Sequence, residues 1–347
     1  MSKNNQREVI YYFSYLRSFA CIGIIILHTV FSLFTVHQAE LNPSITAAVN
    51  SVTNNLMWAV PSFVMITGAL LLDPKRDVSL SKLFHQYVRR ILSALLLFCI
   101  FYRFVDMILN QEAFSVQIIL DALYKFITGT SWSHLWYLYL LIGLYLILPG
   151  MKAVTKVCSD TELRYLTLVG VIFLSVLRLT SFMGLNVGFY IHIATIYPVY
   201  MLLGYCISKD IIPVSFMTAI LLTVLSTAFV IGTTYLFYTK NIANLDSLWG
   251  YPALPIVLQS IGLFSLFKHI QIKENTFHKI VCQLDSVSFG IYLIHFLFIR
   301  ILLRIWKVNP FVSGTVFMIP LFIVGILLVS WLVVWILKKI PFFKTIL

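Results

Sequence analysis

Runs of about twenty apolar residues recur along this chain, and each could cross the hydrocarbon core of a bilayer as a helix. Of the 347 residues, 60% are hydrophobic and only 11% are charged, which is too little charge to cover a soluble protein. The sequence therefore predicts an all-α fold, a polytopic membrane helix bundle. Because no stretch is polar enough to form a separate extramembrane unit, we expect residues 1–347 to form a single domain.

The apolar runs divide the chain into about ten candidate transmembrane helices. An even number of spans returns the chain to the side of the membrane where it begins. A further apolar stretch, residues 115–130, fits a short or re-entrant helix. The expected spans lie near residues 12–36, 52–73, 90–109, 134–151, 163–182, 188–208, 214–238, 251–268, 281–303 and 314–338.

Basic residues are distributed unequally between the two ends of these expected helices. If the N-terminus is cytoplasmic, most of the 25 Lys and Arg residues fall in cytoplasmic segments, as the positive-inside rule requires. Both termini are therefore predicted to be cytoplasmic. The net charge of +12 has the same topological explanation, so we expect no nucleic-acid partner and only membrane lipids around the bundle.

One cytoplasmic connection has the pattern of a surface helix. In the segment "DVSLSKLFHQYVRRIL", apolar residues recur at helical spacing from Leu80 to Ile91, whereas the basic residues lie elsewhere on the turn. This pattern predicts an amphipathic helix near residues 78–90 that runs into the third span. Attraction to lipid headgroups would explain its charges without any further function.

The first apolar run contains two costly side chains, Arg17 and His28. Eleven helical residues make about three turns and rise about 16 Å, so both side chains share one face at different depths. Arg17 at a helix end could simply extend to the membrane surface. An ionisable residue at mid-membrane usually faces a cavity and serves a function, although His28 could also be a hydrogen-bonded core histidine.

A shared face with a cation at one end and a histidine deeper inside suggests a channel for a long anionic substrate. Acyl-coenzyme A has this shape, with phosphates at one end and a thioester at the other. In such a channel, opening from the cytoplasm onto both side chains, His28 would meet the thioester. Imidazole titrates near neutrality, so His28 could act as the general base that takes a proton from an acceptor hydroxyl.

Six stretches in order along the chain carry a resemblance to one family, the integral-membrane acyltransferase 3 family. The first is Arg-x10-His at Arg17 and His28, and the second resembles the family's Pro-x-Phe-Phe-x-x-Ser-Gly motif, with Thr67 where Ser is usual. By its length and motifs the chain most resembles the stand-alone O-acetyltransferases of surface polysaccharides. The second stretch in full is "VPSFVMITGALLL" (60–72). The other four are "RR" (89–90), "HLWYLYLLIGLYLILPGM" (134–151), "YPVYMLLGYCISK" (197–209) and "SFGIYLIHFLFI" (288–299).

The resemblance implies an enzyme of the bacterial inner membrane that moves an acyl group, usually acetyl, from acyl-CoA to a hydroxyl of a glycan or its lipid-linked precursor. It implies that His28 is catalytic. A direct transfer and a relay through an acyl-histidine both fit the sequence. By this resemblance Arg17, Arg89 and Arg90 would bind acyl-CoA, and Thr67 and Gly68 of the second motif are further candidates for the donor site.

Several of these residues, and the candidates for the acceptor side, also have structural explanations. Gly68 could serve close helix packing instead of lining a donor channel. The acceptor-side candidates are His134, Trp136, Tyr137, Arg103, Asp106 and His295. An aromatic belt at the membrane interface would account for the first three. Arg103 and Asp106, three positions apart, could form an ion pair with each other, and His295 could be a hydrogen-bonded core residue.

Other chemistries lack their motifs in this sequence. We find no Gly-x-Ser-x-Gly nucleophile elbow, no P-loop and no His-Glu-x-x-His zinc motif, so no metal is expected. The alternative to an O-acetyltransferase is a transporter or flippase for a polysaccharide or lipid-linked sugar, because ten helices with a basic inner rim fit that function too. The apolar spans contain few acidic residues, which argues against proton-coupled transport.

Overall fold

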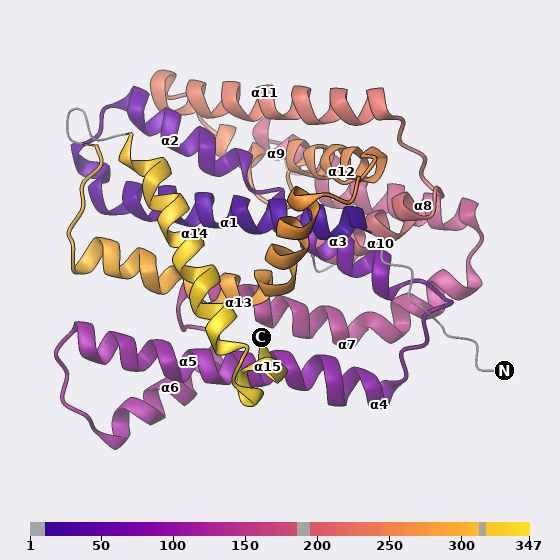
Figure 1. Ribbon diagram of the computed structural model, residues 1–347. Coiled ribbons are helices and arrows are strands. Elements are labelled where there is room, and N and C mark those ends of the chain that lie inside the picture. Colours follow the sequence, from indigo (N-terminus) through magenta and orange to yellow (C-terminus); the bar gives the residue numbers. More distant parts are fainter. Residues whose placement is uncertain (1–10, 186–194, 312–316) are drawn as a thin grey trace.

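Every element of the computed structural model is helical in the residues that it describes, which are 11–185, 195–311 and 317–347 (Figure 1). The predicted all-α class is therefore confirmed. The longer helices lie roughly side by side in one bundle, and α14 crosses them obliquely (Figure 1). The principal helices are α1 (Tyr11–His37), α2 (Pro43–Asn55), α3 (Ala59–Leu71), α5 (Arg89–Leu109), α6 (Val116–Thr128), α7 (Trp136–Val157), α8 (Asp160–Val171), α10 (Tyr197–Ser208), α11 (Phe216–Lys240), α12 (Leu254–His269), α13 (Thr276–Arg304) and α14 (Met318–Leu337).

Seven helical segments of the described residues are long and apolar enough to cross a membrane. The expected count of about ten is not confirmed among these residues, because two expected spans take another form and a third lies partly outside the described residues. Residues 163–182 form α8, a π-helical segment η4 (Ile172–Val176) and the short α9 (Leu179–Phe182); the expected span 251–268 is the 16-residue α12. The expected span 188–208 is described only from residue 195, and α10 accounts for 12 of its residues.

Helix α1 occupies the centre of the bundle. It packs against α2, α3, α12, α13 and α14 (Figure 1). Its buried face is apolar, and its one basic residue near the N-terminal end, Arg17, forms an ion pair with Asp285 of α13 at 2.7 Å. This pairing compensates the cost of placing a guanidinium inside the bundle. Side chains on α1 are therefore fixed relative to those on α13.

Helices α3 and α10 approach each other more closely than side chains would permit. A Cβ atom at Gly68 would lie 2.1 Å from the backbone oxygen of Met201, and one at Gly204 would lie 2.0 Å from that of Met65. The two glycines thus form a reciprocal crossing of the small-residue type common between membrane helices. Gly68 does not line either of the cavities described below.

The segment predicted as an amphipathic helix is helical from Leu80 onward. The short α4 (Leu80–Lys82) passes through a π-helical segment, η2 (Leu83–Val88), directly into α5. Leu83 and Val88 are buried, whereas Leu80 and Phe84 are exposed. The stretch 115–130 also forms a helix, the 13-residue α6, which packs beside α5 and ends at Gly129 in the left-handed conformation.

Candidate active site

Two cavities lie at different levels along α1. We call the first, of about 420 Å³, the arginine cavity, because Arg17, Arg76 and Arg90 line it. We call the second, of about 620 Å³, the histidine cavity, because His28 and His134 line it. The two cavities share no lining residue.

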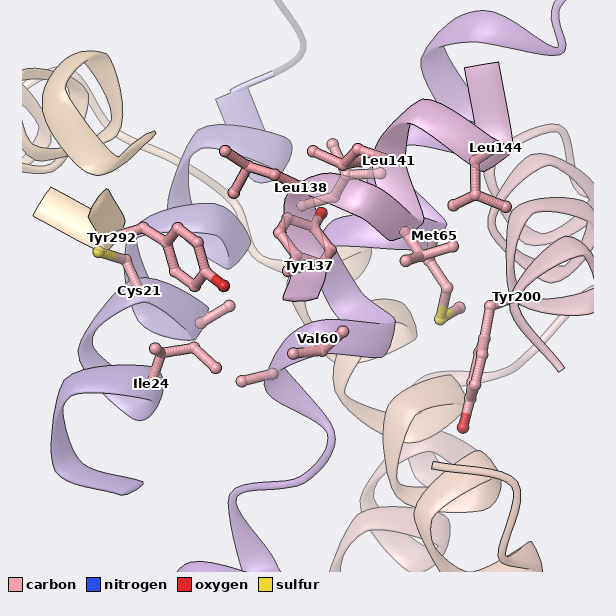
Figure 2. Close-up of a cluster of buried hydrophobic side chains, with 14 of the residues drawn as sticks. Cys21, Ile24, Val60, Met65, Tyr137, Leu138, Leu141, Leu144, Tyr200 and Tyr292 are labelled. Atoms are coloured by element: carbon pink, nitrogen blue, oxygen red, sulfur yellow. The ribbon is translucent and has the colours of Figure 1, made fainter. Parts of the chain in front are cut away.

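Arg17 and His28 therefore do not open onto a common cavity, and this part of the sequence interpretation is wrong. The helical spacing placed both residues on one face but gave no information about what fills the space between them. Tyr137 of α7 and Tyr292 of α13 line the inner end of the arginine cavity, with ring centroids 5.6 Å apart. Figure 2 shows the two tyrosine rings beside each other, and they meet edge to face. We call Tyr137 and Tyr292 the tyrosine partition.

His28 forms a dyad with His295 of α13. The Nδ1 atom of His28 lies 2.8 Å from the Nε2 atom of His295, and the Nδ1 atom of His295 lies 3.1 Å from the carbonyl oxygen of Ile291. A carbonyl only accepts, so His295 Nδ1 carries the proton and its Nε2 accepts. His28 Nδ1 must then donate to His295, which leaves His28 Nε2 as an unprotonated acceptor. His295 is fully buried, whereas His28 is only partly buried and lines the histidine cavity.

A third histidine, His134, lies beside this dyad. Its ring centroid is 5.5 Å from that of His295 and 6.4 Å from that of His28. Its Nε2 atom lies 3.3 Å from the carbonyl oxygen of Leu293, so Nε2 carries the proton, and its buried Nδ1 atom has no hydrogen-bond partner among the described residues. The hydroxyl of Tyr292 donates to the backbone oxygen of His134, which connects the partition to the histidine cluster.

The arginine cavity has three guanidinium groups and one carboxylate. Arg17 is paired with Asp285, and Arg76 donates to the Leu70 carbonyl at 3.1 Å. Arg90 donates to the main-chain oxygen of Ile346, at the end of α15 (Pro341–Ile346), at 3.0 Å, and to that of the last residue, Leu347, at 2.7 Å. Because cationic side chains outnumber anionic ones in its lining, the arginine cavity favours an anionic ligand. Arg76 and Asp285 were not among the expected site residues, because both lie just outside the stretches that carry the family resemblance.

The other predicted donor-site residues have different locations. Thr67 lines the arginine cavity, and its hydroxyl donates to the carbonyl of Phe63. Arg89 does not line the cavity, whereas its neighbour Arg90 does. Gly68 packs against α10. The structure thus brings together Arg17, Thr67 and Arg90, but not Arg89 or Gly68.

The predicted acceptor-side residues divide between the two cavities. Trp136 lines the histidine cavity, whereas its neighbour Tyr137 lines the arginine cavity. Arg103 and Asp106 line the histidine cavity but do not pair with each other, because other residues hold them. Trp132 donates from its Nε1 atom to Asp106 at 2.9 Å. Hydroxyl and amide side chains complete the polar lining: Ser32, Thr35, Asn50, Thr53, Asn54, Thr130, Ser131 and Ser133.

Comparison with known proteins gives one match. A family model described as an acyltransferase domain matches residues 10–335, which is nearly the whole chain. No curated protein and no solved structure matches this sequence. The matched region contains both cavities, except for the Leu347 contribution to the arginine cavity.

Proposed function

The chain belongs to this membrane acyltransferase family, and on that premise we propose that it transfers an acetyl group from acetyl-CoA to a hydroxyl of a cell-surface glycan or its lipid-linked precursor. The proposed location is the bacterial inner membrane, with the arginine cavity on the cytoplasmic side, where acetyl-CoA is present. The observation that carries the proposal is the His28–His295 dyad between a cationic cavity and a polar one.

The arginine cavity has the chemistry required for the donor. Guanidinium groups bind phosphate oxygens with good geometry, and Arg17, Arg76 and Arg90 line one cavity. The apolar and aromatic side chains of Phe63 and Leu141 provide a less polar path for the acyl-bearing arm. The tyrosine partition lies at the end of this path, and we propose that the thioester reaches the histidine dyad between its two rings.

The histidine cavity has the chemistry required for a saccharide acceptor. Its hydroxyl and amide groups can exchange hydrogen bonds with sugar hydroxyls, and Trp136 and Phe296 offer apolar ring surface. His28 lines this cavity with one nitrogen free to accept a proton. An acceptor hydroxyl that enters the cavity would therefore find a general base within it.

The proposed reaction is a direct acyl transfer. His28 Nε2 takes the proton of the acceptor hydroxyl while the hydroxyl oxygen attacks the thioester carbonyl carbon. The carbon–sulfur bond then breaks, and the leaving thiolate receives the proton from His28. The products are the acetyl ester and free coenzyme A. His295 accepts the Nδ1 proton of His28 throughout, which holds the ring in the tautomer that presents Nε2 as the base.

The test is a His28→Ala variant, compared with the unchanged chain and with a His269→Ala control. His269 is exposed at the end of α12 and lines neither cavity. General-base removal is expected to reduce transfer by about 10²–10⁴-fold, measured as glycan acetyl content by NMR and as acceptor-dependent release of coenzyme A. Unchanged acetylation in a well-expressed His28→Ala variant would exclude the proposed role.

A further inference from the structure

A charged wall on one side of the histidine cavity is not explained by the transfer chemistry. Arg103 of α5, Lys125 of α6 and Arg300 of α13 line the cavity there, together with Asp106. An adjoining hollow of about 240 Å³ shares these four residues and adds Arg304 among its lining. We call Arg103, Lys125 and Arg300 the basic wall.

Three carboxylates lie beside the basic wall and fix its side chains. Asp121 is held by Arg103 at 2.5 Å and by Lys125 at 3.0 Å, and it does not line the cavity. Glu112 pairs with Arg103 at 2.5 Å. Asp106 accepts from Trp132 and lies 3.9 Å from Arg300. The three carboxylates therefore balance the three positive charges of the wall and orient its side chains, and what remains unsatisfied are individual guanidinium donors.

Two donors of the basic wall have no partner. The Nη1 atom of Arg103 and the Nε atom of Arg300 are buried and have no hydrogen-bond partner among the described residues. A buried unsatisfied donor is costly, and a donor of a charged group more so. The guanidinium of Arg300 is also held over the ring of Trp132, with its Cζ atom 5.0 Å from the ring centroid. These groups are fixed in place by the fold and lack only an acceptor.

We propose that the acceptor carries an anionic group, a phosphate or a carboxylate, which binds the basic wall while a neighbouring hydroxyl meets His28. Oxyanions accept hydrogen bonds from guanidinium donors with good geometry. His28 and the basic wall line the same cavity of about 620 Å³. One saccharide unit with an acidic substituent can therefore contact both. The contact of a hydroxyl with His28 rests on the proposed function, whereas the binding of an anion at the basic wall does not.

The test is a binding measurement on the purified full-length chain without acyl donor. The probes are glucose 1-phosphate, glucuronic acid, glucose and glycerol 3-phosphate, titrated by calorimetry. We expect at least one of the two acidic sugars to bind about tenfold more tightly than glucose, with an affinity that falls as salt rises. Arg300→Gln and Lys125→Gln should remove this preference, and Arg300→Lys should retain part of it. Lys240→Gln, an exposed position that lines neither cavity, is the control.

Three results would overturn the inference. The first is that glucose and both acidic sugars bind with equal affinity, or that neither acidic sugar binds. Another is a preference for acidic sugars that survives in both Arg300→Gln and Lys125→Gln. The third is glycerol 3-phosphate binding as tightly as the acidic sugars, because the wall would then be a site for a lipid headgroup. Repeating the titration with His28→Ala separates the two proposals, since that change should abolish transfer and leave acid binding intact.

Discussion

His295 Nε2 accepts a hydrogen bond from His28 Nδ1 across 2.8 Å, although the two residues are 267 positions apart in the sequence. The bond joins α1 to α13, the same pair of helices that Arg17 and Asp285 join near the N-terminal end of α1. Two polar contacts thus fix the rotation of α1 in the bundle. The free nitrogen of His28 is a consequence of this arrangement.

Replacement of His295 should impair turnover more than substrate binding. His295→Phe keeps a ring in the buried site but removes the acceptor for His28, so we expect kcat to fall by on the order of 10²-fold with little change in KM. His295→Gln retains an acceptor oxygen and should recover part of the rate. Steady-state kinetics with the proposed donor, acetyl-CoA, and the proposed glycan acceptor provide the measurement. Equal activity in His295→Phe and the unchanged chain would exclude a positioning role.

Opening the tyrosine partition should allow water to reach the thioester. Tyr137→Ala removes one of the two rings between the cavities, so we expect hydrolysis of acetyl-CoA without acceptor to rise about tenfold. Leu144→Ala is the matched control, because Leu144 is buried on the same helix and lines neither cavity. Free coenzyme A can be measured with a thiol reagent. A similar rise in both variants would point to general loosening of the bundle.

The two adjacent arginines should differ in donor binding. Arg90 lines the arginine cavity and Arg89 does not. Arg90→Gln should weaken acetyl-CoA binding about tenfold, or about 1.4 kcal/mol, whereas Arg89→Gln should change it by less than about twofold. Calorimetric titration of the purified variants measures both effects. Equal losses would indicate that general positive charge, and not the cavity, binds the donor.

The crossing of α3 and α10 should not tolerate a methyl group. A Cβ atom at Gly68 would overlap the backbone of Met201, so Gly68→Ala is expected to destabilise the fold by about 1–3 kcal/mol or more. Gly143→Ala on α7 is the control, because a Cβ atom there would meet nothing within 4 Å. It should be neutral or slightly stabilising. Thermal unfolding in detergent distinguishes the two, and comparable unfolding temperatures would contradict the close contact.

Asp73, in the connection after α3 and outside the candidate spans, should make a pH-dependent contribution to the free energy of unfolding. Burial raises the pKa of Asp73, but the hydrogen bond from Lys209, the backbone N–H of Lys75 and their two charges outweigh it, so the pKa lies below 3.8. The charged form therefore stabilises the folded state above the ordinary pKa, and this contribution is lost as pH falls through the lower folded-state value.

Asp73→Asn should accordingly lower stability by about 0.5–1 kcal/mol at pH 7, because the pair is partly exposed. The difference from the unchanged chain should shrink as pH falls below about 4. Thermal unfolding in detergent at pH 7, 5 and 3 provides the measurement. A difference that stays constant over this range would mean that Asp73 contributes packing and not charge.

The helical class could be predicted from sequence because a bilayer admits few backbone structures and the apolar runs are long. Segment length was less informative for residues 163–182, where the apolar run continues but the backbone changes from α8 to a π-helical segment and then to α9. Counting apolar residues detects composition and cannot detect such a change.

The candidate site shows the same division between local and long-range information. The common face of Arg17 and His28 follows from the helical repeat. Contacts between distant helices, such as His28 with His295 and Arg17 with Asp285, depend on how helices pack, and one sequence does not reveal this. For the same reason the contact of Tyr137 with Tyr292 could not be predicted, although Tyr137 was an expected site residue.

The separation of the two cavities has a consequence for the membrane itself. In the proposed reaction the donor and the acceptor would each dock in a separate cavity, and only the acyl group would pass from one to the other. The bundle would then join two large substrates without either of them having to cross it.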